Sequence, residues 1–338
     1  MPAVSVLLPC YNATTTLEQA LESLASQTFT DFEVVAIDDG STDSTAEILQ
    51  RWSREDTRFN IYSQPHGGII TALNLGLHKS NANYIARMDA DDLCHPERLE
   101  RQVDYLEAHP EVSLVGCRVA GYPPDSLRRG FNIYIDWQNA LVSDADIRRE
   151  IFIESPLAHP SVTFRKNWVE RAGGYQEHGW PEDYDLWLRL YLLGAQFAKV
   201  PEVLVYWRDK GERLTRTDRR YSLENFLRAK AHYLARGPLI GREAVIIWGA
   251  GMVGRRLSKH LERQGIPLSA FIDIAPGKIG GSLRRLPILS PAQLPGLWQR
   301  LDQPVLLAAV AARGARALIR VHLSDLSLVE GQDWWSVA

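Results

Sequence analysis

The sequence predicts an α/β protein of two domains, the second smaller than the first. Up to about residue 83, short apolar runs alternate with stretches whose apolar residues have helical spacing. Strands separated by single helices imply right-handed crossovers and a mostly parallel sheet. The alternation resumes after Gly237-Pro238, where the apolar run Ala244–Trp248 meets a glycine-rich turn. The expected domains are therefore residues 1–236 and 241–338.

Each expected element follows from one of these patterns. In the first domain, strands are expected at Val4–Leu8, Phe32–Ile37, Asn60–Tyr62, Tyr84–Met88 and Val200–Val205. Helices are expected at Thr16–Gln27, Ser44–Trp52, Ile70–His78, 96–109, Asp183–Leu193 and Tyr221–Ala235. In the second domain, the helix Met252–Gln264 and the strand Leu268–Ile272 should follow the glycine-rich turn. Between about residues 112 and 160 the pattern loosens.

Composition narrows the class of protein. The chain has 338 residues, 45% of them hydrophobic and 23% charged, which is ordinary for a globular protein with a full core. A net charge of -3 gives no electrostatic reason to expect a nucleic acid partner. No apolar run approaches the roughly 18 residues needed to span a bilayer, which leaves peripheral membrane association open. The widely spaced Cys10, Cys94 and Cys117 predict free thiols in a reducing compartment, hence a cytoplasmic enzyme.

Polar residues follow three of the predicted strands: Pro9-Cys10-Tyr11-Asn12, Asp38-Asp39-Gly40-Ser41 and Asp89-Ala90-Asp91-Asp92. In parallel sheets the ligand binds at the carboxyl ends of the strands. Hard cations such as Mg²⁺ or Mn²⁺ take carboxylate oxygens, and Asp89 and Asp91 supply two of them. Because D-x-D is a short pattern, a turn before the helix at Pro96 is by itself the commoner explanation of the same aspartates, with Asp92 in a capping or supporting role.

The other candidates also have two interpretations. Asp38 and Asp39 suit hydrogen bonds from a base or a ribose, or capping of the helix near Ser44. Tyr11 suits stacking on a base, or a surface turn. Gly67 lets the backbone pass close to a ligand, or belongs to a plain loop. Further along, the acids that follow Pro181 suit a catalytic base, or the favourable first turn of a helix.

Three segments in order carry a family resemblance. They are VSVLLPCYNATTTLEQALESLASQTFTDFEVVAIDDGSTDST, HGGIITALNLGLHKSNANYIARMDADDLCHPERLERQ and GWPEDYDLWLRL. Together they resemble glycosyltransferase family 2, the inverting transferases with a GT-A fold, over about residues 3 to 210. The resemblance implies transfer of a sugar from a nucleotide diphosphate sugar, a UDP-sugar in the favoured form, to a glycan, lipid-linked or protein acceptor.

The resemblance also implies a role for each candidate. Asp39 matches the base-contacting position, and the nucleotide-sugar set comprises Pro9, Tyr11, Asp38, Asp39, Gly67 and Asp89. Asp91, with Asp89, matches the ligands of a divalent metal. Asp183 matches the catalytic base, and the acceptor side comprises His159, Trp180 and Glu182. A histidine that commonly follows the Tyr-x-Arg strand is missing here, and Arg208 or Lys210 is the expected substitute.

The second domain opens with a glycine fingerprint, Gly249, Gly251 and Gly254, trailed about 20 residues later by Asp273. The segments WGAGMVGRRLSKHL, FIDIAPGKIGG and LPILSPAQL resemble the small Rossmann-like domain of bacterial sugar O-acyltransferases. That resemblance implies nucleotide-sugar binding or docking. An NAD(P) site, and with it a sugar-nucleotide oxidoreductase, stays open as an alternative, as does an inactive nucleotide-sugar binding module.

Overall fold

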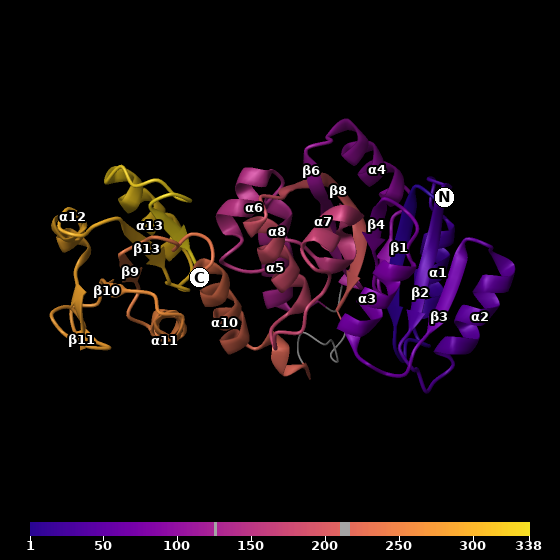
Figure 1. Cartoon of the computed structure of the whole chain (residues 1–338), viewed down its shortest axis with the longest axis horizontal. Helices are drawn as coiled ribbons and strands as arrows, with labels where there is room; N and C mark the ends of the chain where they lie inside the picture. Colours follow the sequence, from indigo (N-terminus) through magenta and orange to yellow (C-terminus); the bar gives the residue numbers. More distant parts are fainter. Residues whose placement is uncertain (125–126, 210–216) are drawn as a thin grey trace. The chain divides into compact units, whose positions relative to one another are not determined.

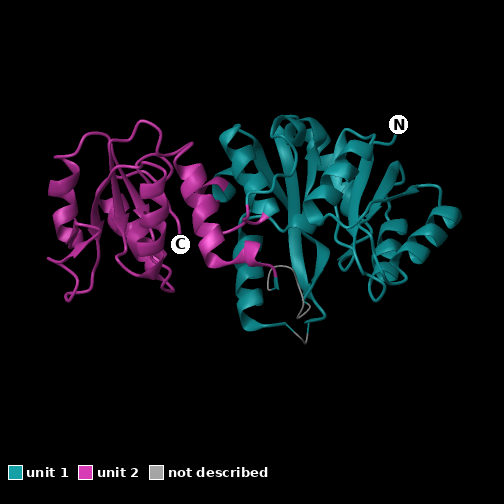
Figure 2. Cartoon of the chain, turned by 60° about the horizontal axis from the view of Figure 1, so that its bottom comes forward, with its two compact units in different colours: residues 1–147, 156–178, 182–217 teal, residues 148–155, 179–181, 218–338 magenta. Residues whose placement is uncertain are grey.

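The computed structural model describes residues 1–124, 127–209 and 217–338 and divides them into two compact units (Figure 2). Unit 1 comprises residues 1–147, 156–178 and 182–217, and unit 2 comprises residues 148–155, 179–181 and 218–338. Within the described part of the chain, no helix has the length and apolar character that crossing a bilayer requires.

Unit 1 is built on an eight-stranded sheet with the order β3-β2-β1-β4-β7-β6-β8-β5 (Figure 1). The first four strands are mutually parallel, as the sequence predicts. The other half of the sheet is mixed, because β7 and β5 run antiparallel to their neighbours. The strands are β1 (Val4–Cys10), β2 (Phe32–Asp38), β3 (Phe59–Ser63), β4 (Tyr84–Arg87), β5 (Leu93–Cys94), β6 (Val112–Tyr122), β7 (Thr163–Arg165) and β8 (Gln196–Arg208).

Helices cover both faces of this sheet. Alternate residues of the strands point to opposite faces, so Val34 belongs to the core that includes residues of α1 and α4, while Val35 packs with Ala72 of α3. The helices are α1 (Leu17–Ala25), α2 (Thr45–Glu55), α3 (Ile69–Lys79), α4 (Arg98–Ala108), α5 (Arg129–Ala140), α6 (Asp144–Glu150), α7 (Lys166–Arg171) and α8 (Glu182–Leu192).

The elements predicted for the first domain are present, with ends displaced by a few residues. The loosened stretch between residues 112 and 160 contains β6, α5 and α6. The first half of β6 is buried on both faces, so Val112–Cys117 lacks the alternation by which a half-buried strand is recognised.

Unit 2 is built on a six-stranded sheet with the order β11-β12-β10-β9-β13-β14, parallel except for the β11–β12 hairpin. Ile246, Ile272, Leu306 and Leu323 belong to its core. The strands are β9 (Ala244–Trp248), β10 (Leu268–Ile272), β11 (Ser282–Leu283), β12 (Leu286–Leu289), β13 (Pro304–Ala308) and β14 (Trp334–Ser336). The helices are α10 (Leu223–Leu234), α11 (Met252–Arg263), α12 (Leu294–Trp298) and α13 (Ala315–Asp325).

Helix α10 belongs to unit 2. His260 Nε2 on α11 lies 2.8 Å from Glu224 Oε1 on α10, and Lys230 Nζ donates a hydrogen bond to the carbonyl oxygen of Val337 (3.1 Å). The sequence interpretation instead assigns this helix to the first domain, with the boundary at Gly237-Pro238. The spacing of apolar residues in an amphipathic helix does not show which parts of the chain its polar residues contact, so the sequence pattern could not assign α10 to unit 2.

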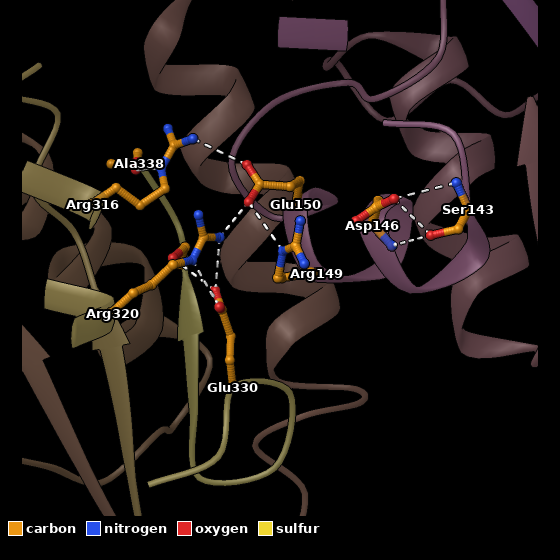
Figure 3. A network of polar contacts seen from close by, with 9 residues as sticks. Ser143, Asp146, Arg149, Glu150, Arg316, Arg320, Glu330 and Ala338 are labelled. Atoms are coloured by element: carbon orange, nitrogen blue, oxygen red, sulfur yellow. Dashed lines mark hydrogen bonds and ion pairs between the residues drawn. The ribbon is translucent and has the colours of Figure 1, made fainter. Parts of the chain in front are cut away.

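An earlier segment of the chain joins unit 2 through Glu150 (Figure 3). This buried carboxylate forms ion pairs with Arg316 (3.0 Å) and Arg320 of α13. Arg320 also pairs with Glu330 at 2.8 Å. A buried carboxylate is stable only when it is paired, so these arginines fix the segment against α13.

Candidate active site

The polar strand ends of unit 1 meet at one edge of its sheet. Strand β1 lies between β2 and β4, and Cys10 at its end is paired in register with Asp38. Burial raises the pKa of the Cys10 thiol, and the negative charges of Asp38 and Asp89 raise it further. The two carboxylates therefore flank the end of β1 from the neighbouring strands.

The carboxylate of Asp39 organises the loop that precedes α3. Asp39 is buried, and its oxygens accept hydrogen bonds from the backbone N–H groups of Gly67 (2.9 Å) and Gly68 (2.8 Å). The side-chain amide of Gln64 donates to the same carboxylate at 2.6 Å, and His66 Nδ1 lies 2.9 Å from Oδ2. A ligand that contacts the carboxylate of Asp39 therefore also lies next to the loop of residues 64–68.

Tyr11 lies beside this loop with its side chain exposed. Its ring stacks on that of His66, with the centroids 4.1 Å apart and the planes inclined by 20°. Because His66 is itself held by Asp39, the stack fixes Tyr11 near the buried carboxylate. The pair presents a planar surface of the kind on which another ring packs.

Three other members of the predicted nucleotide-sugar set have structural partners. Pro9 is buried within β1. Asp38 Oδ1 accepts a hydrogen bond from the backbone N–H of Ser41 (3.1 Å), which closes the turn after β2. A Cβ on Gly67 would lie 2.6 Å from Thr71 Oγ1, so a side chain there collides with α3. These residues shape the loops around the strand ends.

The carboxylates of Asp89, Asp91 and Asp92 gather just after β4. One oxygen from each lies within 4.8 Å of the others. Asp92 is buried, and its Oδ1 accepts a hydrogen bond from the backbone N–H of Arg208 (2.8 Å). Carboxylate oxygens gathered in this way fit the ligand preference of Mg²⁺ or Mn²⁺.

Arg208 ties the acidic loop to other parts of unit 1. Its Nε donates to the backbone carbonyl of Asp91 (2.7 Å), and its Nη2 donates to Gln19 Oε1 (2.8 Å). Arg208 therefore holds the backbone of the acidic loop. Lys210, the other expected substitute for the missing histidine, lies outside the described residues.

Arg87, the last residue of β4, forms an ion pair with Asp89. Its side chain is buried. Burial by itself lowers the pKa of Arg87, but the charge of Asp89, with a smaller contribution from that of Glu182, outweighs burial and raises that pKa. The guanidinium therefore stays charged beneath the acidic loop.

His159, Tyr175 and Glu182 form a buried group in unit 1. His159 Nε2 lies 2.8 Å from the Tyr175 hydroxyl, and its Nδ1 lies 3.9 Å from Glu182 Oε1. Burial lowers the pKa of His159 well below its ordinary value, and the charge of Arg87 lowers it further. His159 is therefore neutral at physiological pH. Two of the three predicted acceptor-side residues, His159 and Glu182, thus lie together.

Asp183 follows Glu182 in the first turn of α8 and is partly exposed. Its Oδ1 accepts a hydrogen bond from the backbone N–H of Tyr184 (2.7 Å). Burial raises the pKa of Tyr175, and the charges of Glu182 and Asp183 contribute to that increase. Asp183 is therefore close enough to the buried group to act on it electrostatically.

Trp180, the third predicted acceptor-side residue, lies in unit 2 and packs against α10. Its ring centroid lies 5.3 Å from that of His232 and 6.3 Å from that of Tyr233. Arg228 places its guanidinium 5.6 Å from the same ring.

The glycine fingerprint of unit 2 lies between β9 and α11. Gly249 has a φ of +119°, and a Cβ there would lie 2.8 Å from the carbonyl oxygen of Ala309. A Cβ on Gly254 would lie 1.8 Å from the carbonyl oxygen of Gly249, so only glycine lets α11 pack this closely. A Cβ on Gly251, by contrast, would meet no atom within 4 Å. Gly251 therefore faces open space.

Asp273 follows β10 and holds the glycine loop. Its carboxylate accepts hydrogen bonds from the backbone N–H groups of Ala250 and Ala275, each at 2.9 Å. Lys278 Nζ donates to the same carboxylate at 2.8 Å. A ribose hydroxyl that binds Asp273 therefore has to share it with these three donors.

A cavity of about 500 Å³ opens in unit 2 beside these residues. Gly251 and Asp273 line it together with Leu318 and His322 of α13, and most of its wall is apolar. It lies beyond the ends of β9 and β13, where the strand order reverses, which is the usual ligand site of an open parallel sheet. Its volume is typical of small-molecule sites.

Three residues near the strand ends escaped sequence reasoning: His66, Arg87 and Tyr175. Arg87 carried a signal, since it is the one charged residue in the apolar strand YIAR. His66 and Tyr175 carried none, because each owes its place to partners far away in the sequence. Asn74 of α3, for example, accepts a hydrogen bond from the backbone N–H of Tyr175 (2.9 Å).

Comparisons with known proteins agree with this geometry. A family model described as Glycosyl transferase family 2 matches residues 5–172. The amylovoran biosynthesis glycosyltransferase AmsE of Erwinia amylovora is 38% identical over 204 residues, which cover 60% of this chain and 74% of that relative.

Solved structures show the fold. TarS 1-349 of S. aureus in complex with UDP-GlcNAc has a TM-score of 0.58 at 18% identity, covering 78% of this chain and 72% of that one. The mannosyltransferase PcManGT of Pyrobaculum calidifontis, in complex with GDP-Man and Mn²⁺, has a TM-score of 0.51 at 20% identity, covering 69% of this chain and 62% of that one. The fold shared with these enzymes is GT-A. With its related sequence and matching family model, this chain is a glycosyltransferase and belongs to glycosyltransferase family 2.

Proposed function

We propose that this glycosyltransferase moves a sugar from a nucleotide diphosphate sugar to a hydroxyl group of a glycan, lipid-linked or protein acceptor. The observation that carries the proposal is the gathering of Asp89, Asp91 and Asp92 after β4, at the edge of the sheet where Asp39 follows β2. UDP is the favoured nucleotide, supported by the UDP-GlcNAc bound to TarS. The role of AmsE in amylovoran biosynthesis supports a place in polysaccharide synthesis.

Asp91 and Asp89 would hold a divalent cation, Mn²⁺ or Mg²⁺. Such a cation stabilises the negative charge that develops on a departing diphosphate. The cluster of carboxylate oxygens fits this group, and the Mn²⁺ complex of PcManGT supports the same assignment. Arg208 fixes the backbone of the acidic loop, and Arg87 pairs with one oxygen of Asp89.

The nucleoside would bind at the ends of β1 and β2. Asp39 and the loop it holds would receive the base, and Tyr11 would pack on it. Asp183 would remove the proton from the attacking hydroxyl, in a single displacement that inverts the anomeric carbon. Glu182 and His159 would lie on the acceptor side.

The proposal is tested with the full chain by titrating UDP, and separately GDP, in the presence of Mn²⁺ and then of a chelator. UDP-sugars are next assayed for release of UDP with and without sugar acceptors. We expect metal-dependent UDP binding and donor turnover. Binding of GDP but not UDP would change the donor, and binding of neither nucleotide would refute the proposal.

For unit 2 we propose a non-catalytic role in binding a nucleotide or nucleotide-sugar, or in docking. The apolar cavity with Gly251 at its edge supports a ligand, and the resemblance to the Rossmann-like domain of sugar O-acyltransferases supports a nucleotide. Lys278 already pairs with Asp273, so the ribose of any nucleotide in this site would share that carboxylate with the ammonium group. Titration of UDP, UDP-sugars and NAD in chelator tests this, with Gly251→Val as the variant that should lose binding. Turnover of NAD would favour the oxidoreductase instead.

We further propose that the enzyme works in the cytoplasm. Cys10, Cys94 and Cys117 are free and buried, which fits a reducing compartment. Labelling of all three thiols in protein unfolded directly from cells, without a reductant, would support this location. Incomplete labelling would count against it.

A further inference from the structure

The cavity of unit 2 has an apolar wall on the side of α13. One face of this helix, with the spacing i, i+3, i+4 and i+7, lines the cavity with Ala315, Leu318, Ile319 and His322. Ile319 is buried, whereas Leu318 is 73% exposed and Ile274, which lines the cavity after β10, is 75% exposed. Apolar side chains that are exposed around a cavity are typical of a ligand-binding site, where the ligand covers them.

His322 is the polar residue of this wall, and one of its ring nitrogens lacks a partner. Its Nε2 is buried, and none of the residues that the structure describes forms a hydrogen bond with it. The ring lies edge-on to that of Trp248, which also lines the cavity, with the centroids 5.2 Å apart and the planes inclined by 74°. Because a buried polar group without a partner is costly, we expect a ligand to supply the missing hydrogen bond.

Asp273 and Lys278, the other ionisable residues among the described ones that line the cavity, are paired with each other at 2.8 Å. The carboxylate of Asp273 also accepts hydrogen bonds from the backbone N–H groups of Ala250 and Ala275. The unpartnered nitrogen of His322 therefore distinguishes it from these two residues.

This combination of apolar walls and a single unpaired ring nitrogen favours a nucleobase over a sugar. A base is a flat ring that packs its faces against apolar or aromatic side chains and presents hydrogen-bonding atoms at its edge. A sugar carries hydroxyl groups around its whole ring, and most of them would be buried against α13 without partners. The wall formed by α13 and Trp248 therefore fits the base of a nucleotide.

Phosphate groups fit another part of the same cavity, the start of α11. Gly251 is the N-cap of this 12-residue helix and, as a glycine, has no side chain to accept hydrogen bonds from the first N–H groups. A Cβ on Gly251 would meet no atom within 4 Å, so the backbone there is open to a ligand. Free N–H groups at the start of a helix bind phosphate.

We propose that the cavity binds a nucleotide with its base against Trp248 and α13 and its phosphates at the start of α11, and that His322 selects the base through a hydrogen bond at Nε2. The sugar of a nucleotide-sugar would then lie outside the cavity, beyond the phosphates. This inference rests on the nucleotide-binding role proposed above for unit 2, and it makes His322 a specificity-determining residue.

The experiment titrates UDP, CDP, ADP and GDP into the full chain in the presence of a chelator, which removes the metal-dependent binding proposed for unit 1. His322→Phe keeps a ring and loses both nitrogens, and His322→Leu lacks the ring as well. His78→Phe, on the exposed face of α3 in unit 1, is the matched control. Gly251→Val assigns the site, because nucleotide binding that survives this substitution does not belong to the cavity.

We expect the wild type to prefer one of the four bases. His322→Phe should weaken binding of the preferred nucleotide about tenfold, the effect of one lost hydrogen bond, and should leave the other three within about twofold. The preference would thereby be lost. His78→Phe should behave as the wild type, and UDP binding that depends on Mn²⁺ should be the same in the wild type and in all the variants.

Unchanged affinities in His322→Phe would overturn the inference and leave nucleotide binding by unit 2 standing, and so would equal affinity of the wild type for all four nucleotides. If His322→Phe does not fold, as judged by circular dichroism, His322→Leu decides by the same criterion. Binding in chelator that survives Gly251→Val, or no binding of any of the four nucleotides to the wild type, would refute the nucleotide role of unit 2 as well. Sugar transfer by unit 1 is tested separately, through its dependence on Mn²⁺.

Discussion

The ammonium group of Lys230 donates a hydrogen bond to the carbonyl oxygen of Ile153 at 2.6 Å, which joins α10 to the 148–155 segment inside unit 2. Burial lowers the pKa of Lys230 from 10.5 to about 8; Glu154 opposes this decrease, and Arg316 adds to it. Between these two values the unfolded chain binds more protons than the folded chain. The free energy of unfolding should therefore rise from about pH 8 to pH 10.5. Below pH 8 the cost of burying the charged ammonium group of Lys230 lowers the free energy of unfolding by its full amount. Lys230→Met should flatten this rise in the free energy of unfolding, which denaturant unfolding at a series of pH values measures. An unaltered pH dependence would show that the pKa of Lys230 is not lowered in the folded chain.

Asp91→Asn should abolish Mn²⁺-dependent binding of UDP and leave the fold intact. An amide keeps the shape of the carboxylate and loses the charge that a hard cation requires. Calorimetric titration with and without Mn²⁺ checks this, and Asp104→Asn on the exposed face of α4 is the control. A variant that keeps the UDP affinity and the Mn²⁺ dependence of the wild type would remove Asp91 from the metal site.

Asp183→Asn should lower the rate of sugar transfer by about 10²–10⁴-fold, the usual contribution of a positioned general base. Donor binding should be spared, because the proposed role of Asp183 concerns the acceptor hydroxyl. Single-turnover rates and UDP titrations separate the two effects. Loss of donor affinity with an unchanged single-turnover rate at saturating donor would instead place Asp183 in the nucleotide pocket.

Two glycines of the same fingerprint should respond differently to alanine. Gly254→Ala should destabilise unit 2 by about 2 kcal/mol or more, because a Cβ there lies 1.8 Å from the carbonyl oxygen of Gly249 and the backbone must shift. Gly251→Ala should change stability by less than about 0.5 kcal/mol, since its Cβ enters open space. Denaturant unfolding of the two variants compares them directly. Similar losses in both would contradict the close packing of α11 on the glycine loop.

A fragment of residues 218–338 should unfold at a higher temperature than a fragment of residues 241–338. The longer fragment retains α10. Glu224 of this helix pairs with His260, and its Lys230 donates a hydrogen bond to the carbonyl oxygen of Val337. Circular dichroism during heating measures both fragments. Equal unfolding temperatures would show that α10 does not stabilise unit 2 and would favour a domain boundary at Gly237-Pro238. Both fragments lack Glu150, so its loss does not affect the comparison.

The sequence by itself determined the parts of this protein that depend on neighbouring residues. Apolar spacing located most of the strands and helices, because burial of one face repeats with the period of the element. The acidic run after β4 and the glycines after β9 were visible for a similar reason, since each is a local pattern at the end of a strand. The family to which the protein belongs follows from the order of such patterns along the chain.

The tertiary structure decided everything that depends on partners distant in the sequence. It buried Arg87 against Asp89 and brought His159 close to Tyr175 and Glu182. It also placed the carboxylate of Asp39 where the backbone N–H groups of the 64–68 loop donate hydrogen bonds to it. It also grouped α10 with unit 2. None of these contacts is periodic, and a side chain's charge state and position depend on the groups that exclude water from it. Only the folded chain brings those groups together.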